Sequence, residues 1–187
     1  MKRTAICLSL TLLVFHFSFV SAQQPVENLT RAMTLLDNTT RQCFTGTDMR
    51  MYDTYNTSTH RGDGTADVWP YTAALEATCS VLEALDSLRS EQPGLYDQHH
   101  DRYVALLRSL FDNLGYYRGT YRLLSYAHRG GWSIYGVHRS SRKGGANVVG
   151  IENVYDDQMW LCRELVRAYR LTADADYLAE ATMLADY

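Results

Sequence analysis

The spacing of apolar residues along the chain predicts a succession of amphipathic helices. Apolar side chains recur at intervals of three and four residues, which places them on one face of a helix. The pattern holds in five segments, residues 26–36, 74–88, 103–114, 161–169 and 177–185. Pro93-Gly94 separates the second segment from the third, and Asp174 stands where it would cap the fifth. Consecutive amphipathic helices predict an all-α domain built from antiparallel helix pairs.

Two long stretches between these segments lack a sustained period of either kind. Residues 45–67 are rich in Thr, Asp, Gly and Tyr, and residues 115–150 are rich in Gly, Tyr and Arg. A connection as long as the second is usually functional in a compact domain. We expect both stretches to be loops over the mouth of a helical scaffold.

The first residues have the features of a secretory signal peptide. A basic start at Lys2 and Arg3 precedes an apolar stretch over residues 5–20, and the small residues Ser21 and Ala22 follow. The apolar stretch is shorter than the roughly 20 residues that span a bilayer. We therefore expect residues 1–22 to be removed, residues 23–187 to lack a membrane span, and the protein to reach the periplasm, the cell surface or the medium.

Composition excludes some partners and leaves others open. Loss of Lys2 and Arg3 with the signal peptide would change the net charge from −3 to −5. A mildly acidic chain without a clustered basic face is not expected to bind nucleic acid, whereas a neutral polysaccharide is compatible with it.

The three cysteines beyond the signal peptide, Cys43, Cys79 and Cys162, make neither a disulfide framework nor a set with metal-ligand spacing. Buried thiols are favoured at Cys79 and Cys162, although one bridge stays open. We predict no metal and no cofactor.

The candidate chemistry lies in two adjacent carboxylates, Asp156 and Asp157, at the start of the fourth helical segment. Two acids in a small space cannot both ionise freely, so their pKa values separate and one can be a nucleophile while the other is an acid. An acidic residue before a helix is also a common N-cap and suits the helix dipole. The pair alone favours capping, so the surrounding residues must decide.

Residues 150–160 (GIENVYDDQMW), with residues 168–172 and 177–181, resemble glycoside hydrolase family 76, the secreted α-1,6-mannanases. Weaker likenesses lie at residues 67–71 and 116–119. The resemblance implies an (α/α)6 barrel of antiparallel helix pairs, of which this chain would supply the N-terminal half. It also implies a monomeric, endo-acting and retaining mannanase with Asp156 as nucleophile and Asp157 as acid/base.

Retaining glycosidases hold their two carboxyl groups about 5–5.5 Å apart, which neighbours in sequence can achieve. Side chains of adjacent residues diverge by about 100° on a regular helix. We therefore expect Asp156 and Asp157 at a loop-to-helix junction. We also expect repulsion from Asp156 to be the main reason that the pKa of Asp157 is raised.

Aromatic side chains offer flat apolar faces for sugar rings, and Tyr155, Trp132 and Trp69 are the candidates. Trp160 is expected to pack between helices instead. Asn153 would donate a hydrogen bond to a sugar hydroxyl or close an Asx-turn. The expected partner of the site is the polysaccharide mannan.

Two other functions remain open. A sugar epimerase or an unsaturated-uronide hydrolase would use an acid/base histidine or a cationic site in the same scaffold, and His128 and His138 lie in the long connection. A glycan-binding protein that has lost catalysis is the third possibility, although the presence of both Asp156 and Asp157 argues against it.

Overall fold

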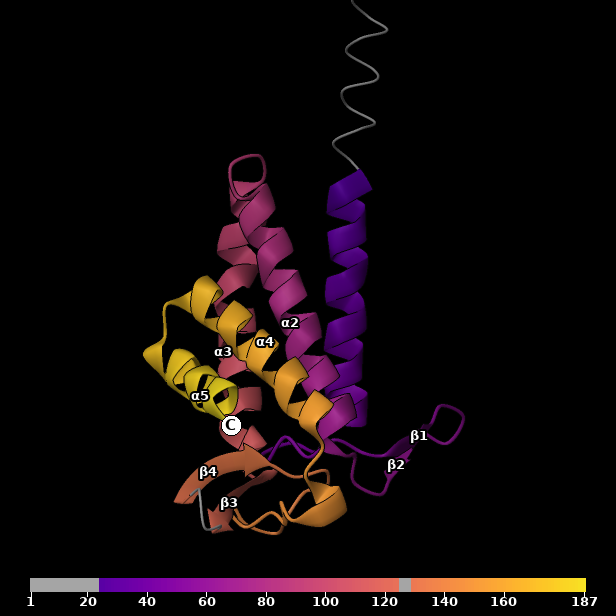
Figure 1. The fold of residues 1–187 in the computed structure, drawn as a ribbon. Helices are drawn as coiled ribbons and strands as arrows, with labels where there is room; N and C mark the ends of the chain where they lie inside the picture. The colour runs from indigo at the N-terminus through magenta and orange to yellow at the C-terminus, as the bar shows by residue number, and fades with distance from the viewer. Residues whose placement is uncertain (1–23, 125–128) are drawn as a thin grey trace, which may run out of the picture.

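The computed structural model describes residues 24–124 and 129–187. The predicted signal peptide and His128 lie outside the described residues. The structure is mostly helical, as the apolar spacing predicts (Figure 1). Its helices are an N-terminal helix over residues 24–43, α2 (Val68–Leu88), α3 (Pro93–Leu114), α4 (Tyr155–Thr172) and α5 (Ala175–Asp186), with a 3-10 turn, η1 (Gly150–Glu152), before α4.

The helices form two pairs that pack on each other. The chain reverses between α2 and α3, reverses again between α4 and α5, and α4 lies across α2 (Figure 1). Pro93 occupies the first turn of α3, where its missing N–H costs nothing. Asp174 caps α5 by accepting a hydrogen bond from the Asp176 amide at 3.0 Å, as predicted.

The apolar faces of the helices meet in one core. The core includes Leu75, Leu82, Leu107, Leu110, Leu161 and Leu165, none more than 1% exposed.

The expectation that both non-helical stretches are loops was wrong, because each contains an antiparallel hairpin. β1 (Thr54–Asn56) pairs with β2 (Arg61–Asp63), and β3 (Arg118–Leu124) pairs with β4 (Arg129–Tyr135). Both hairpins lie at the end of the helical body where α2 and α4 begin (Figure 1). They therefore flank the first turns of these two helices.

Gly119 in β3 and Gly136 directly after β4 help to explain why this hairpin is hard to recognise from sequence. A Cβ on Gly119 would lie 2.2 Å from the Ala146 carbonyl oxygen, and one on Gly136 would lie 2.1 Å from the Asn147 carbonyl oxygen. The chain that follows β4 can press against the hairpin only because these side chains are absent. Glycine lowers the local preference for strand, although here the tertiary structure requires it.

Gln158 joins the start of α4 to the end of β4. Its side-chain oxygen accepts the Tyr135 N–H at 3.0 Å, and its Nε2 donates to the Tyr135 carbonyl. Gln158 is buried, so this amide satisfies both polar groups of a buried peptide unit. The Tyr135 hydroxyl in turn donates to the buried Glu180 on α5 at 2.5 Å, and Arg118 lies 3.2 Å from the same carboxylate.

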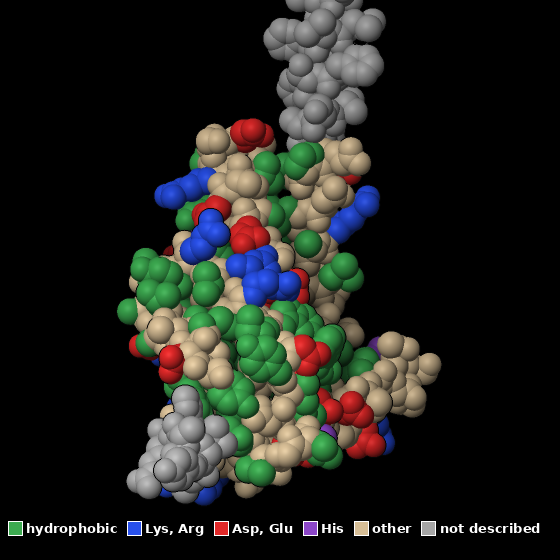
Figure 2. Space-filling model, in the orientation of Figure 1, with side chains coloured by type: hydrophobic (Ala, Val, Ile, Leu, Met, Phe, Trp, Pro, Cys, Tyr) green, Lys and Arg blue, Asp and Glu red, His purple; other side chains and the backbone are tan. Residues whose placement is uncertain are grey.

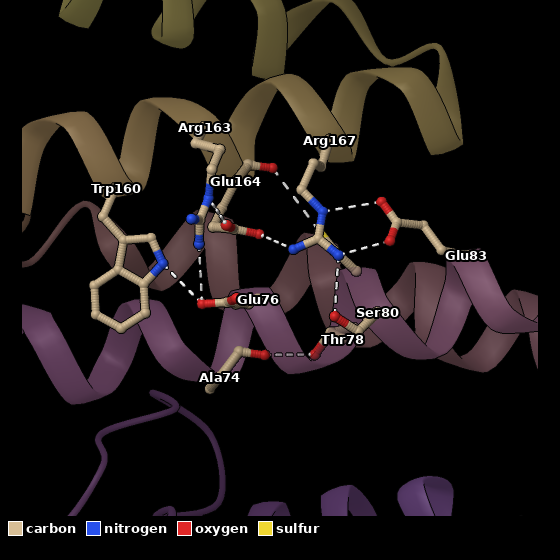
Figure 3. A network of polar contacts seen from close by, with 10 residues as sticks. Ala74, Glu76, Thr78, Ser80, Glu83, Trp160, Arg163, Glu164 and Arg167 are labelled. Atoms are coloured by element: carbon tan, nitrogen blue, oxygen red, sulfur yellow. Dashed lines mark hydrogen bonds and ion pairs between the residues drawn. The ribbon is translucent and has the colours of Figure 1, made fainter. Parts of the chain in front are cut away.

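Arginines on α4 tie it to α2 through carboxylates on both helices (Figure 3). Glu164 is buried and accepts hydrogen bonds from Arg163 Nε at 2.7 Å and from Arg167 Nη1 at 2.6 Å. Arg167 also forms a two-point contact with Glu83 on α2, at 2.9 and 2.7 Å, and Arg163 lies 3.2 Å from Glu76. The buried charge of Glu164 is thereby compensated.

Cys43, Cys79 and Cys162 are free thiols, and Cys79 is fully buried as predicted, while Cys162 is partly exposed. Within residues 24–124 and 129–187, no helix is both long and apolar enough to cross a membrane.

Replacement of Gln158 by Ala should lower the free energy of unfolding by about 2–4 kcal/mol, because it leaves the N–H and carbonyl of Tyr135 buried without partners. Chemical denaturation followed by circular dichroism measures the change. The matched control is Gln98→Ala on the exposed side of α3, which should stay within about 0.5 kcal/mol of the parent. Equal stabilities of the two variants would contradict this role for Gln158.

Candidate active site

Asp156 and Asp157 lie in the first turn of α4, at the predicted junction between loop and helix. The N-cap position is Val154, and no side chain caps this helix end. Neither carboxylate is therefore used as a cap. Both lie near the positive end of the helix dipole, which favours negative charge.

The two carboxylates have different surroundings. Asp156 is exposed, whereas Asp157 is only 7% exposed. The pKa of Asp157 is raised above its usual value, first by burial and then by the charges of Asp156 and Asp67. The expectation that repulsion dominates was wrong, since position 157 turns toward the packed side of α4 and loses most of its contact with water.

Asp157 also differs from the other buried carboxylates that the structure describes. Glu164 has two arginine partners, and Glu180 has a tyrosine and an arginine. No described side chain pairs with Asp157 or with Asp156. The carboxylate oxygens of Asp157 are not among the fully buried polar atoms, so this largely buried acid stays open to solvent. An accessible acid with a perturbed pKa is a candidate for catalysis.

Two further carboxylates, Asp67 and Glu152, lie on either side of His138, and neither was predicted from the sequence to belong to the site. Asp67 is the N-cap residue of α2, and its Oδ1 lies 2.6 Å from His138 Nδ1. His138 Nε2 lies 3.8 Å from Glu152 Oε1 in η1. The charge of Asp67 reaches Asp157. The only signal for Asp67 was the weak likeness at residues 67–71, and nothing local links it to His138.

Trp69 and Trp160 meet where α2 and α4 begin. Their rings pack edge to face with centroids 4.8 Å apart, and Trp160 Nε1 donates to Glu76 Oε2 at 2.8 Å. Trp160 thus packs between the helices, as expected, while Trp69 keeps 52% of its surface exposed. On α4, Trp160 follows Asp156 by four residues and lies on the same side of the helix.

The other predicted sugar contacts converge on Tyr187. Its ring centroid lies 5.6 Å from that of Trp132 and 6.4 Å from that of Tyr155. Asn153 Nδ2 donates to the Tyr187 hydroxyl. The expected donor group of Asn153 is therefore already used, and its Oδ1 is a buried acceptor without a partner among the described residues.

Tyr121 on β3 completes this cluster, facing Trp132 across the hairpin. Figure 2 shows hydrophobic side chains gathered over α4 and beside α2, next to acidic side chains at the lower end of the helical body. Large exposed hydrophobic residues of this region are Trp69, Ile151, Tyr155 and Met159. Apolar faces beside carboxylates suit a ligand with both flat apolar faces and hydroxyl groups.

A separate apolar groove of about 620 Å³ runs between the N-terminal helix and α2, lined by residues such as Leu29, Leu35, Ala73 and Ala77. None of the predicted site residues lines it. In the described part of the chain, no group of three or more His, Cys, Asp or Glu side chains has the arrangement of a metal site.

No protein-family model matches this chain, and no curated protein matches it.

Replacement of Asp156 by Asn should lower the pKa of Asp157 but leave it above the usual aspartate value, because burial contributes more than the Asp156 charge. Carbon-13 NMR titration of labelled aspartate carboxyl groups measures this pKa directly. A return to the usual value in Asp156→Asn would show that repulsion dominates after all.

Replacement of Asp157 by Asn should stabilise the fold at neutral pH. A raised carboxyl pKa means that the folded state holds this proton more tightly, so stability falls as pH rises from the unfolded pKa through the folded pKa. Asparagine does not ionise, so the melting temperature of the variant should exceed that of the parent at pH 7 and the difference should shrink at pH 3. A lower melting temperature at pH 7 would contradict burial of an unpaired charge.

Proposed function

We propose that the chain is the catalytic part of a retaining glycosidase that cleaves α-1,6-mannan, in an endo-acting manner. The observation that carries the proposal is the pair of adjacent carboxylates at the start of α4, one exposed and the other buried, unpaired and with a raised pKa. Unequal environments are what separate a nucleophile from an acid of the same residue type.

In the proposed reaction, Asp157 donates its proton to the glycosidic oxygen while Asp156 attacks the anomeric carbon. The bond from that carbon to the leaving oxygen breaks, and a covalent mannosyl ester forms on Asp156. Asp157, now a carboxylate, accepts a proton from water as the water attacks the anomeric carbon and releases Asp156. The helix dipole at the start of α4 favours Asp156 as the departing carboxylate.

The residues around the pair supply sugar contacts in this proposal. Trp69 and Tyr155 are exposed aromatic rings on either helix start, and Trp132 lies in the cluster around Tyr187. Asn153 would accept a hydrogen bond from a sugar hydroxyl through Oδ1 rather than donate one. Aromatic faces and a few placed polar groups are the usual composition of a small-ligand site.

A larger helical scaffold belongs to the same proposal. One antiparallel helix pair is the repeating unit of an (α/α)6 barrel, and α2–α3 and α4–α5 would be two such units. The apolar groove along the N-terminal helix and α2 offers a surface for further helices. We propose that this chain forms the N-terminal half of such a barrel, in a monomeric enzyme exported by the signal peptide at residues 1–22.

His138 favours a second candidate function, a sugar epimerase that would use it as acid or base, because the ring lies beside Asp67 in the same region. The hydrogen bond with Asp67, together with the charges of Asp67 and Glu152, raises the pKa of His138, which disfavours the neutral ring that a base requires. The glycosidase is therefore the favoured hypothesis. An epimerase would leave the length of the polymer unchanged and alter its monosaccharides.

Linear α-1,6-mannan incubated with the chain should yield shorter oligosaccharides, with the α-anomer formed first in proton NMR. Asp156→Asn and Asp157→Asn should each lower kcat/KM by ~100- to 10,000-fold, since each removes one of the two reacting groups. The exposed Asp97→Asn variant on α3 is the matched control and should retain parental activity.

Mass spectrometry of a fluorinated mannoside adduct should place the covalent sugar on the peptide that contains Asp156. Near-parental activity of Asp156→Asn would reject its assignment as nucleophile. An initial β-anomer would reject the retaining mechanism, and a polymer bound but not shortened would favour the non-catalytic glycan-binding function.

A further inference from the structure

The backbone around His138 is held on both sides. Before it, the Val137 carbonyl accepts the Val68 N–H at 2.8 Å, and the Val137 N–H donates to the Glu152 carbonyl at 3.2 Å. One residue thus connects the start of α2 to η1. The position of His138 relative to both segments is therefore set by main-chain hydrogen bonds.

After it, the Arg139 side chain is anchored away from the site. The side chain is only 7% exposed, and its guanidinium lies 3.9 Å from the centre of the Tyr116 ring and donates to the Asp48 carbonyl at 2.9 Å. Arg139 Nη1 also lies 3.4 Å from the Asp48 carboxylate. The backbone on both sides of His138 is fixed, but 67% of the side chain is exposed, so the place of the ring is set by the contacts of its two nitrogens.

That place is the space between two carboxylates from different elements. Nδ1 faces Asp67 on the cap of α2, and Nε2 faces Glu152 in η1. The hydrogen bond with Asp67 and the two negative charges raise the pKa of His138, so the ring keeps its positive charge to higher pH. Asp67 is also the carboxylate whose charge acts on Asp157 from outside α4.

We propose that His138 is a positioning residue for the reacting pair, because its ring bridges Asp67 and Glu152 and fixes Asp67 at the start of α2, which meets the start of α4 at the contact of Trp69 with Trp160. The inference rests on the proposed glycosidase, in which Asp157 must hold a proton before the first step. His138 acts through Asp67 and needs no contact with substrate.

The charged groups around His138 determine how loss of its ring would change the pKa of Asp157. Asp67 and Glu152 face the ring, Arg139 is occupied by Asp48, and the charge of Asp67 acts on Asp157 together with that of Asp156. Without the positive ring, the negative charge of Asp67 is uncompensated. The pKa of Asp157 should then rise, because a nearby like charge disfavours the ionised form.

The test compares His138→Gln with the parent in two backgrounds. Carbon-13 NMR titration of the full chain should show a higher Asp157 pKa in His138→Gln, and no change when His138→Gln is added to Asp67→Asn. His138→Lys, which restores a positive charge, should move the pKa back toward the parental value. His100→Gln, which removes another histidine that contacts an aspartate, should leave Asp157 unaffected.

An assay of enzyme activity on mannan is an independent test. In His138→Gln, the basic limb of the pH profile of kcat/KM on α-1,6-mannan should move to higher pH together with the Asp157 pKa. A purely structural role would lower the melting temperature without moving the limb.

An unchanged Asp157 titration in His138→Gln would overturn the inference, and so would an equal shift in the Asp67→Asn background. Because the titration needs no turnover, it decides the role of His138 even if the chain fails to cleave mannan. That failure would count against the proposed function alone.

Discussion

The pairing of the Gln158 side chain with the Tyr135 peptide is the contact on which the candidate site depends. It joins the second residue after Asp156 to the last residue of β4, so the first turn of α4 cannot shift along the hairpin without leaving a buried peptide unsatisfied. The same strand end is held to α5 through Glu180. The position of the carboxylate pair is therefore set by buried hydrogen bonds rather than by the flexibility of a loop.

Burial of carboxylates has two different outcomes in this fold. Glu164 and Glu180 are surrounded by donors, which compensate their charges and tie elements together. Asp157 is buried in the same helix as Glu164 but has no described partner, so its burial raises its pKa. Asp157 is thus the buried carboxylate that holds its proton to higher pH than an ordinary aspartate, at a cost in stability when it ionises.

The hairpins bring together groups that the helices alone would keep apart. The chain after β4 crosses between the start of α2 and η1, and main-chain hydrogen bonds of Val137 join these segments. His138 and Arg139 then point to opposite sides, one toward Asp67 and the other toward Asp48. This part of residues 115–150, which has no periodic pattern in the sequence, therefore connects the start of α2, with Asp67, to the segment before α4, which carries Asp156 and Asp157.

The sequence by itself determined the helices, the Asp174 cap and the place of Asp156 and Asp157 at a helix start, because each depends on neighbours within one or two turns. Only the tertiary structure decided the hairpins, the burial of Asp157 and the contact of Asp67 with His138, which lie 71 residues apart. Gly119 and Gly136 illustrate the reason. A glycine lowers the local preference for a strand. The reason that no side chain fits at these two positions is that the carbonyl groups of residues 146 and 147 pack against them.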